Sequence, residues 1–289
     1  MGVVTVKKIL ITGGRGFIGS HSIKYLKKIG FEILAPTSIE LDVLYQCNWE
    51  DWKKQKIDHV IHLAGKTFVP DSWENPEKFF RVNTIGTLNA INFCRQQDIG
   101  MTYISAYIYG QPKSNPISEI ADINPNNPYA KSKHMAEQLC EFFCTYFNMD
   151  ITVLRLFNVY GAKQSERFLI PFIVDQVLNN DTISVQDLAP KRDYVYIDDV
   201  CRAIELSIEN TKGYQLFNIG SGVSYSVSEV IDKVQAIAGT HKKVISKNSI
   251  RRNELNDVKA DIKAIKQVWG WEPQFTLDMG LCQYMEELK

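Results

Sequence analysis

The sequence predicts an α/β fold, a doubly wound parallel sheet with a smaller α/β lobe towards the C-terminus. Short β-branched runs alternate with helix-like segments through the first half of the chain, which is the pattern of parallel strands joined by crossover helices. The alternation loosens after about residue 157, where Pro171 and turn-rich stretches follow. The apolar runs lie at 8–12, 31–35, 58–63, 102–107 and 151–156.

The clearest helix lies between the last two of these runs. Asn127 is expected to cap it, and Pro128 suits its first turn because the first helical N–H has no partner within the helix. Its apolar stripe, which we expect in the core, consists of Ala136, Leu139, Cys140, Phe143 and Phe147.

Two later segments, 193–200 and 214–220, also resemble strands, so the chain is expected to return to the first sheet. We therefore assign residues 1–160 and about 193–220 to the larger domain. Residues 161–192 and 221–289 are assigned to the smaller lobe.

Composition excludes several classes of protein. The 289 residues are 45% hydrophobic and 23% charged, as in soluble globular proteins, and 33 basic residues balance 33 acidic ones. We therefore expect neither a nucleic-acid partner nor a membrane-binding patch. The N-terminal apolar run is short and interrupted by Lys7 and Lys8, so no signal peptide or membrane span is expected and a cytoplasmic protein is implied. The six cysteines form no CxxC pair, which favours reduced thiols, and we expect no metal site.

A glycine-rich loop follows the first strand in the run KILITGGRGFIGS. Glycines at a strand-to-helix turn let the backbone approach a pyrophosphate, and the helix N-terminus supplies unpaired N–H groups, so the larger domain is expected to bind a dinucleotide. A purely structural turn is the alternative. The residues expected at the cofactor are Gly13, Gly14, Arg15, Gly16, Phe17, Ile18 and Gly19.

The end of the second strand bears on the choice of cofactor. An acid there would hold the ribose 2′-OH of NAD, but the sequence reads LAPTS, with no acid before Glu40. Arg15 offers a guanidinium for a 2′-phosphate, unless it is a solvated loop residue. NADP(H) is therefore favoured and NAD(H) remains possible. Asp42 and Val43 are candidates for the adenine edge, with helix capping by Asp42 as the alternative.

Tyr129 and Lys133 stand four residues apart at the start of the predicted helix 128–148 and therefore share one face. A nearby ammonium favours a phenolate, so we expect the pKa of Tyr129 to fall below its usual value of about 10. Such a tyrosine can exchange a proton with a hydroxyl or a ketone. A Tyr and a Lys one turn apart are also common on exposed helix surfaces.

Nine motifs in order resemble the extended short-chain dehydrogenase/reductases of the NAD-dependent epimerase/dehydratase group, which act on nucleotide sugars. The resemblance runs from Lys8 to at least Pro273. The motifs are TGGRGFIGS (12–20), HLAGKTFVPDSWENP (62–76), NTIGTLNA (83–90), SAYIYG (105–110), PISE (116–119), NPYAKSK (127–133), LRLFNVYG (154–161), RDYVYIDD (192–199) and GWEP (270–273). The resemblance implies a Rossmann domain and, from the later segments, a nucleotide-sugar-binding lobe.

The resemblance also implies roles for individual residues. Tyr129 and Lys133 match the catalytic YxxxK, and Ser105 matches the catalytic Ser or Thr. Asn83 matches an active-site asparagine, although it could instead cap a helix over 84–95. Leu63, Ala64, Gly65 and Lys66 are implied at the cofactor ribose, and Lys66 could equally be a solvated charge.

For the substrate, the resemblance assigns Asn158 to the diphosphate region and Arg192 to a phosphate oxygen. The Arg251 and Arg252 pair is assigned to the same anion, since guanidinium groups suit a diphosphate. Tyr107 is expected to contact the substrate. The resemblance further implies a homodimer formed through the helices 84–97 and 129–148.

Ala106 and Tyr107 narrow the reaction by departing from the family patterns. The 4,6-dehydratases and the decarboxylases carry an acid directly after the Ser or Thr, and the GDP-fucose synthases carry a Cys where this chain has Tyr107. The predicted function is therefore an NADPH-dependent reductase of the C4 ketone of a nucleotide-linked 4-keto-6-deoxy sugar. A 4-epimerase with tightly bound NAD is the alternative, and a non-catalytic NADP-sensing regulator on the same fold is a third.

Overall fold

Residues 6–249 and 254–288 are described by the computed structural model, and the chain divides into two units. The first unit contains the chain up to Gly110, together with Ile123–Leu156 and Cys201–Phe217. The second contains Gln111–Asp122, Phe157–Val200 and the chain from Asn218 onward.

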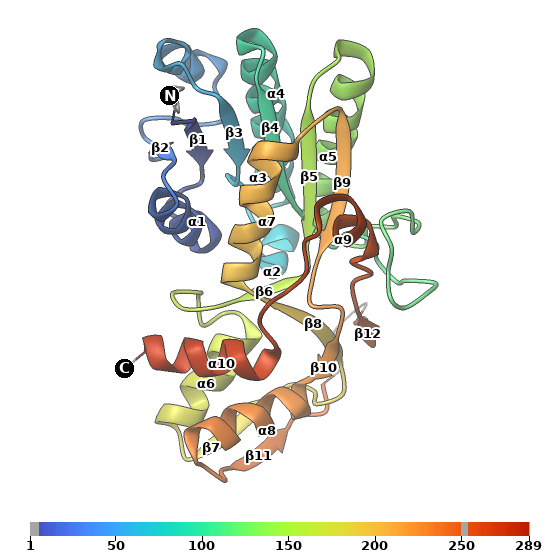
Figure 1. The fold of residues 1–289 in the computed structure, drawn as a ribbon. Helices are drawn as coiled ribbons and strands as arrows, with labels where there is room; N and C mark the ends of the chain where they lie inside the picture. Colours follow the sequence, from blue (N-terminus) through green and yellow to red (C-terminus); the bar gives the residue numbers. More distant parts are fainter. Residues whose placement is uncertain (1–5, 250–253, 289) are drawn as a thin grey trace. The chain divides into compact units, whose positions relative to one another are not determined.

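A six-stranded sheet in the order β2-β1-β3-β4-β5-β9 forms the centre of the first unit (Figure 1). Each of the five predicted apolar runs forms or overlaps a strand, so the predicted parallel α/β class is confirmed. The chain order reverses at β1, which lies between β2 and β3, and parallel sheets bind ligands at the carboxyl ends of strands at such a point. The strands are β1 Lys8–Thr12, β2 Glu32–Leu34, β3 His59–His62, β4 Gly100–Ala106, β5 Ile151–Leu156 and β9 Tyr214–Ile219.

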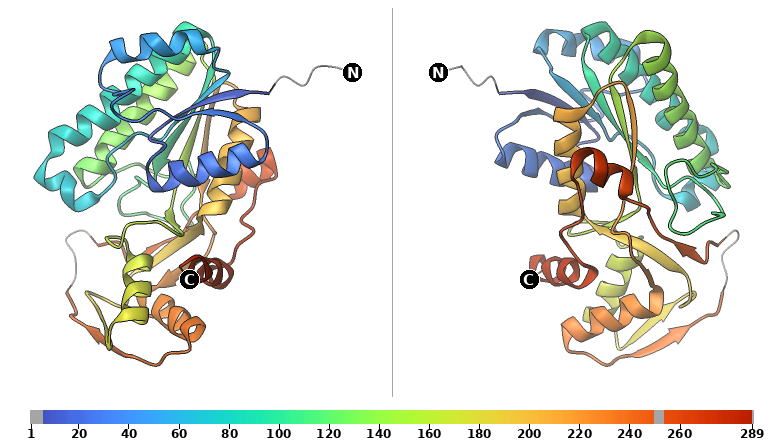
Figure 2. Two further views of the ribbon diagram at one scale, coloured as in Figure 1. Left: turned by 90° about the vertical axis from the view of Figure 1, so that its left-hand side faces the viewer. Right: turned by 45° about the vertical axis from the view of Figure 1, so that its right-hand side comes forward.

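Helices cover both faces of this sheet, with α4 and α5 on one face and α1 and α7 on the other (Figure 2). The helices up to this point of the chain and α7 are α1 Phe17–Lys28, α2 Val69–Glu74, α3 Pro76–Phe80, α4 Gly86–Gln97, α5 Pro128–Phe147 and α7 Ile197–Asn210. A 3₁₀ helix lies at Gln46–Gln55 and a π-helical turn at Arg81–Ile85.

The predicted start of α5 is confirmed, because the Asn127 side chain accepts a hydrogen bond from Ala130 N at 2.8 Å and Pro128 begins the helix. Most of the predicted stripe on α5 is buried with α4 against the sheet, but the ring of Phe147 at the end of the helix is 46% exposed.

The second unit holds a sheet in the order β10-β8-β12, with β6 also paired to β8, and a separate β7–β11 pair. Of the two later segments that resemble strands, β9 joins the six-stranded sheet, whereas β8 pairs with β6, β10 and β12 instead. The strands are β6 Asn158–Tyr160, β7 Thr182–Val185, β8 Lys191–Tyr196, β10 Ser224–Ser226, β11 Lys243–Ser246 and β12 Asp257–Val258. The helices are α6 Leu169–Asn179, α8 Val227–Ala238, α9 Lys263–Trp269 and α10 Leu277–Glu287.

Asp193 ties three segments of the second unit together. Its buried carboxylate accepts hydrogen bonds from the backbone N–H groups of Ser221 at 2.6 Å, Gly222 at 2.9 Å and Ala260 at 3.0 Å. Burial raises the pKa of Asp193, and these donors oppose the rise because they favour the charged carboxylate.

Within the described residues, no helix is both long and apolar enough to cross a membrane.

A chain of buried polar side chains joins β3 and β4 to α7. His59 Nε2 lies 2.8 Å from Thr102 Oγ1, which lies 2.7 Å from Ser207 Oγ. Burial lowers the pKa of His59 to about 3, and the charge on Lys7 adds to this effect. His62 is also buried, and its pKa is lowered to about 3 in the same way, with Lys133 as the added charge. Both imidazoles are therefore neutral at pH 7.

Acid is expected to destabilise the protein through these two histidines. Their folded pKa lies below the unfolded value of about 6.5, so the unfolded chain binds the proton first, and stability present above pH 6.5 is lost as the pH falls towards 3. Between pH 7.5 and 5 each histidine should lower the free energy of unfolding by about 2 kcal/mol.

His59→Gln, which keeps a polar group near Thr102, should remove the His59 share of this loss. Urea unfolding of both proteins at the two pH values measures it. An equal loss in wild type and variant would contradict the explanation.

Candidate cofactor and catalytic site

The glycine loop between β1 and α1 packs directly on the backbone that follows β3. Gly13 has φ +71°, and a Cβ atom there would lie 2.7 Å from Ala64 N. A Cβ atom on Gly19 would lie 2.4 Å from the Gly13 carbonyl oxygen. Gly16 is the N-cap of α1 and provides no side-chain cap for the first N–H groups of the helix. A larger side chain would fill this cradle, so the loop fits the close backbone approach of a pyrophosphate.

The segment Leu63–Lys66 lies beside this loop. Leu63 N donates to the Thr12 carbonyl and Ala64 N to Thr12 Oγ1, both at 3.2 Å. The Lys66 side chain is exposed, but its backbone is held on both sides by Asn83.

Asn83 is not a helix cap. It lies in the π-helical turn that leads into α4, and its side chain is 1% exposed. Asn83 Oδ1 accepts from Lys66 N at 2.8 Å, while its Nδ2 donates to the Lys66 carbonyl at 3.1 Å and to Ser132 Oγ at 2.9 Å. The amide therefore joins the segment Leu63–Lys66 to α5, and π-helical turns often occur at functional sites.

The region after β2 holds no free carboxylate close to the strand end. Glu40 Oε2 accepts from Thr37 N at 2.7 Å, which closes the turn 37–40. Asp42 Oδ1 accepts from Leu44 N at 3.0 Å, so Asp42 makes a local turn and does not cap the following helix, whose N-cap is Tyr45. The Val43 carbonyl accepts from Asn89, and the Arg15 side chain is exposed in the glycine loop.

Ser105, Tyr129 and Lys133 all lie in the first unit, at the end of β4 and the start of α5. Ser105 is 4% exposed, and its Oγ has no hydrogen-bond partner within residues 6–249 and 254–288. Lys133 Nζ donates to the Ile104 carbonyl, one residue before Ser105, at 2.5 Å. A buried hydroxyl without a partner is costly unless a ligand pairs with it, so Ser105 fits a residue that binds a ligand oxygen.

Burial sets the proton affinities of the two titratable groups. It lowers the pKa of Lys133 to about 8, an effect that Glu137 and Cys140 oppose. Burial also raises the pKa of Tyr129, and the charge of a nearby Tyr107 phenolate would raise it further. The expectation that the pKa of Tyr129 falls below its usual value is therefore wrong, because burial disfavours the charged phenolate.

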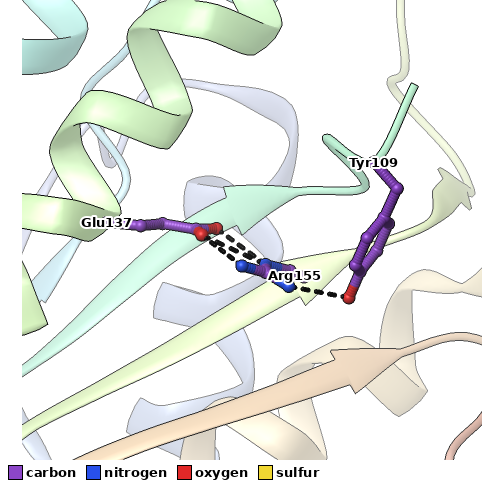
Figure 3. Close-up of polar contacts among 3 residues, drawn as sticks. All are labelled: Tyr109, Glu137 and Arg155. Carbon is purple, nitrogen blue, oxygen red and sulfur yellow. Dashed lines mark hydrogen bonds and ion pairs between the residues drawn. The ribbon is translucent and has the colours of Figure 1, made fainter. Parts of the chain in front are cut away.

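A buried ion pair anchors α5 to the sheet beside these residues (Figure 3). Arg155 Nη2 lies 2.6 Å from Glu137 Oε2, and both side chains are 3% exposed. Arg155 Nε makes two further contacts with the same carboxylate, at 3.0 and 3.1 Å, and Nη1 donates to Tyr109 Oη at 2.9 Å. Arg155 is the register partner of Ser105 on β5, and Glu137 follows Lys133 by one helical turn. The pair therefore holds the helix that carries Tyr129 and Lys133 against the strand next to Ser105.

In the second unit, Asn158 Nδ2 donates to the Asp193 carbonyl at 3.0 Å. Arg192 forms an ion pair with Glu254, and its Nη1 donates to the carbonyls of Lys191 at 2.8 Å and Leu255 at 2.6 Å. An anion at Arg192 would therefore compete with Glu254. Arg251 and Arg252 lie outside the described residues.

Sequence reasoning missed several side chains around the candidate catalytic residues. Arg155 is a charged residue inside an otherwise apolar strand segment, and such a residue signals a buried partner. The sequence does not reveal that partner, because Glu137 is one of several acids on an amphipathic helix. The missed residues are Thr12, His62, Tyr103, Tyr109, Ser132, Glu137 and Arg155.

The fold and the glycine cradle define a dinucleotide-binding α/β protein. The family model "NAD dependent epimerase/dehydratase family" matches residues 9–220, and the chain belongs to this family. It is 33% identical over 288 residues to a GDP-6-deoxy-D-talose 4-dehydrogenase of Aggregatibacter actinomycetemcomitans, with 96% of each chain covered.

Two solved structures are similar over nearly the whole chain. RMD from Pseudomonas aeruginosa complexed with NADPH has a TM-score of 0.90 at 27% identity, with 98% of both chains covered. A UDP-glucose 4-epimerase from Thermotoga maritima with UDP-glucose has a TM-score of 0.89 at 27% identity, with 97% of this chain and 98% of that chain covered.

Removal of one partner of the buried ion pair should destabilise the folded protein. Glu137→Ala leaves the Arg155 guanidinium buried without its counter-ion and is expected to lower the free energy of unfolding by about 3–5 kcal/mol. The double variant Glu137→Leu/Arg155→Met should recover most of this loss. Urea unfolding measures both.

Asp122→Asn is the matched control, because Asp122 pairs with Lys113 at the surface, where the side chains are 72% and 86% exposed. It should leave the unfolding midpoint unchanged. Wild-type stability of Glu137→Ala would contradict the anchoring role of the pair.

Proposed function

We propose that this protein is an NADPH-dependent reductase of the C4 ketone of a nucleotide-linked 4-keto-6-deoxy sugar. The observation that supports a carbonyl or carbinol substrate is the buried hydroxyl of Ser105, which has no hydrogen-bond partner within the described residues. It follows the Ile104 carbonyl that binds Lys133, and it can pair with a ligand oxygen. The Arg15 side chain and the lack of an acid just after β2 favour NADP(H).

Two relatives support reduction of a 6-deoxy sugar. One is the GDP-6-deoxy-D-talose 4-dehydrogenase named above, and the other is a GDP-6-deoxy-D-mannose reductase of Pseudomonas aeruginosa, 28% identical over 288 residues. Their names make GDP the first nucleotide to test. A 4-epimerase is the second candidate, favoured by the Thermotoga structure and by a putative UDP-glucose 4-epimerase of Methanocaldococcus jannaschii, 29% identical over 308 residues.

The proposed roles follow from protonation states. The raised pKa of Tyr129 keeps its phenol protonated, which is the form needed to donate a proton to a ketone oxygen. Ser105 hydrogen-bonds the same oxygen and orients it towards Tyr129. Lys133, in its charged form, stabilises the phenolate that remains and binds the nicotinamide ribose. The bound cofactor supplies the hydride to C4. Tyr107 contacts the sugar beside Tyr129.

The remaining assignments concern the rest of the cofactor and the substrate. The dinucleotide is bound by the glycine loop, Asp42, Val43, residues 63–66 and Asn83. Asn158, Arg192, Arg251 and Arg252 stay assigned to the diphosphate. A homodimer through α4 and α5 is supported by the apolar surface of α5, where Phe142 and Phe147 are 49% and 46% exposed.

The bound nucleotide separates the two candidate reactions. A reductase exchanges its cofactor in every cycle, so the purified protein should be free of stoichiometric NAD, bind NADPH and oxidise it when given GDP-, dTDP-, UDP- or CDP-linked 4-keto-6-deoxy sugars. Mass spectrometry of the nucleotide released on denaturation, together with the loss of NADPH absorbance, measures this. Tightly held NAD at one per chain would favour the 4-epimerase instead.

In the same assay, Arg15→Ala should raise the KM for NADPH by about tenfold or more, because a charged hydrogen bond to the 2′-phosphate is lost. The KM for NADH should stay unchanged. Equal effects on both cofactors would exclude Arg15 as the 2′-phosphate ligand.

Loss of the Tyr129 hydroxyl should stop turnover. Tyr129→Phe removes the proton donor and is expected to lower kcat by about 10²-fold or more, while the Kd for NADPH stays nearly unchanged. Stopped-flow turnover and fluorescence titration measure the two quantities.

Tyr25→Phe, which removes a hydroxyl bound to Glu205 on α7, serves as a control of the same chemistry outside the site. Full activity of Tyr129→Phe would remove Tyr129 as the proton donor.

A further inference from the structure

The face of β4 that carries Ser105 also carries Tyr103. Tyr103 is 1% exposed and belongs to the core formed with α4 and α5. On the neighbouring strand β3, its register partner is His62, whose ring stacks on Tyr103 at a centroid distance of 6.1 Å and an interplanar angle of 24°. Burial raises the pKa of Tyr103, so its phenol is neutral.

The ammonium of Lys133 lies over this ring. Lys133 Nζ is 4.4 Å from the ring centroid of Tyr103, within the range of a cation–π interaction, and Lys133 is 7% exposed. The adjacent Ile104 carbonyl accepts one hydrogen bond from Nζ. An ammonium that has lost most of its hydration therefore lies between a carbonyl oxygen and an aromatic face, and both favour its charged form.

His62 adds no competing charge next to the ring. One of its nitrogens, Nδ1, lies 2.8 Å from Thr12 Oγ1, and its low pKa keeps the imidazole neutral. The ring of Tyr103 thus contacts both a neutral imidazole and the ammonium.

We propose that Tyr103 is a positioning residue, whose aromatic face holds the Lys133 ammonium in its charged state beside Ser105 and Tyr129. The catalytic part of this inference rests on the proposed function, but the interaction itself does not. The hydroxyl of Tyr103 has no role in it, because a cation–π interaction uses the ring.

Other groups also act on the Lys133 ammonium. Glu137 and Cys140, on α5, favour its charged form, although the Glu137 carboxylate already binds Arg155. His62 on β3 is neutral, and Tyr129 at the start of α5 is a neutral phenol in the working pH range. None of these residues is itself replaced in the Tyr103 variants, so a titration of Lys133 compared between variants with and without the ring reports on the ring.

The direct test is a titration of Lys133 by NMR in the full chain labelled with [6-¹³C]lysine, its resonance assigned by its loss in Lys133→Arg. Tyr103→Leu should lower the pKa of Lys133 by about one unit from its value of about 8, because a desolvated cation–π interaction is lost. Tyr103→Phe, the matched control that keeps the ring, should titrate like wild type. If Tyr103→Leu fails to fold, Tyr103→Met fills the space with a flexible apolar chain and should give the same shift.

Kinetics give a second readout. The alkaline limb of the pH profile of kcat/KM should move down by about one unit in Tyr103→Leu and stay in place in Tyr103→Phe, since Lys133 then loses its proton at a lower pH. An unshifted Lys133 in Tyr103→Leu, or an equal shift in Tyr103→Phe, would overturn the inference. If the wild type reduces no keto sugar, the proposed function fails, while the NMR titration still decides the role of the ring.

Discussion

The candidate site depends on the ion pair between Arg155 and Glu137. Both charges have left water, which costs several kcal/mol for each ion unless the partner is well placed, and here the guanidinium makes three contacts of 2.6–3.1 Å with one carboxylate. The pair joins a strand to the helix that carries Tyr129 and Lys133. Any shift of α5 along the sheet would break it, so the pair defines where these two side chains lie relative to Ser105.

The same lack of water sets the chemistry of the site. Burial lowers the pKa of the Lys133 ammonium and raises the pKa of the Tyr129 phenol, so the two values move apart. Both shifts favour the neutral form of the group. Interactions that preserve the charge of Lys133 therefore matter more than they would on a surface. This protection comes from a carbonyl, a carboxylate one turn away and an aromatic ring.

The sequence predicts local structure more reliably than it predicts contacts between distant residues. The strands of the first sheet, the cap at Asn127 and the glycine loop follow from nearby residues, and each has a local physical signal. Other features depend on distant residues or on burial. These are the sheet to which β8 belongs, the ion pair of Arg192 with Glu254, and the upward shift of the Tyr129 pKa. Asn83 shows the difference: its local position left helix capping open as an alternative to a role in the active site, whereas its hydrogen-bond partners lie 17 and 49 residues away.

The pairing of Asn83 with Lys66 imitates a neighbouring strand, because one amide side chain exchanges both an N–H and a C=O contact with one backbone residue. It fixes the backbone at Lys66, beyond the end of β3 at His62. Since both contacts go to main-chain atoms, the side chain at position 66 is left unconstrained by them. That position can therefore change during evolution or engineering, altering the exposed side chain next to the glycine loop without disturbing the path of the backbone.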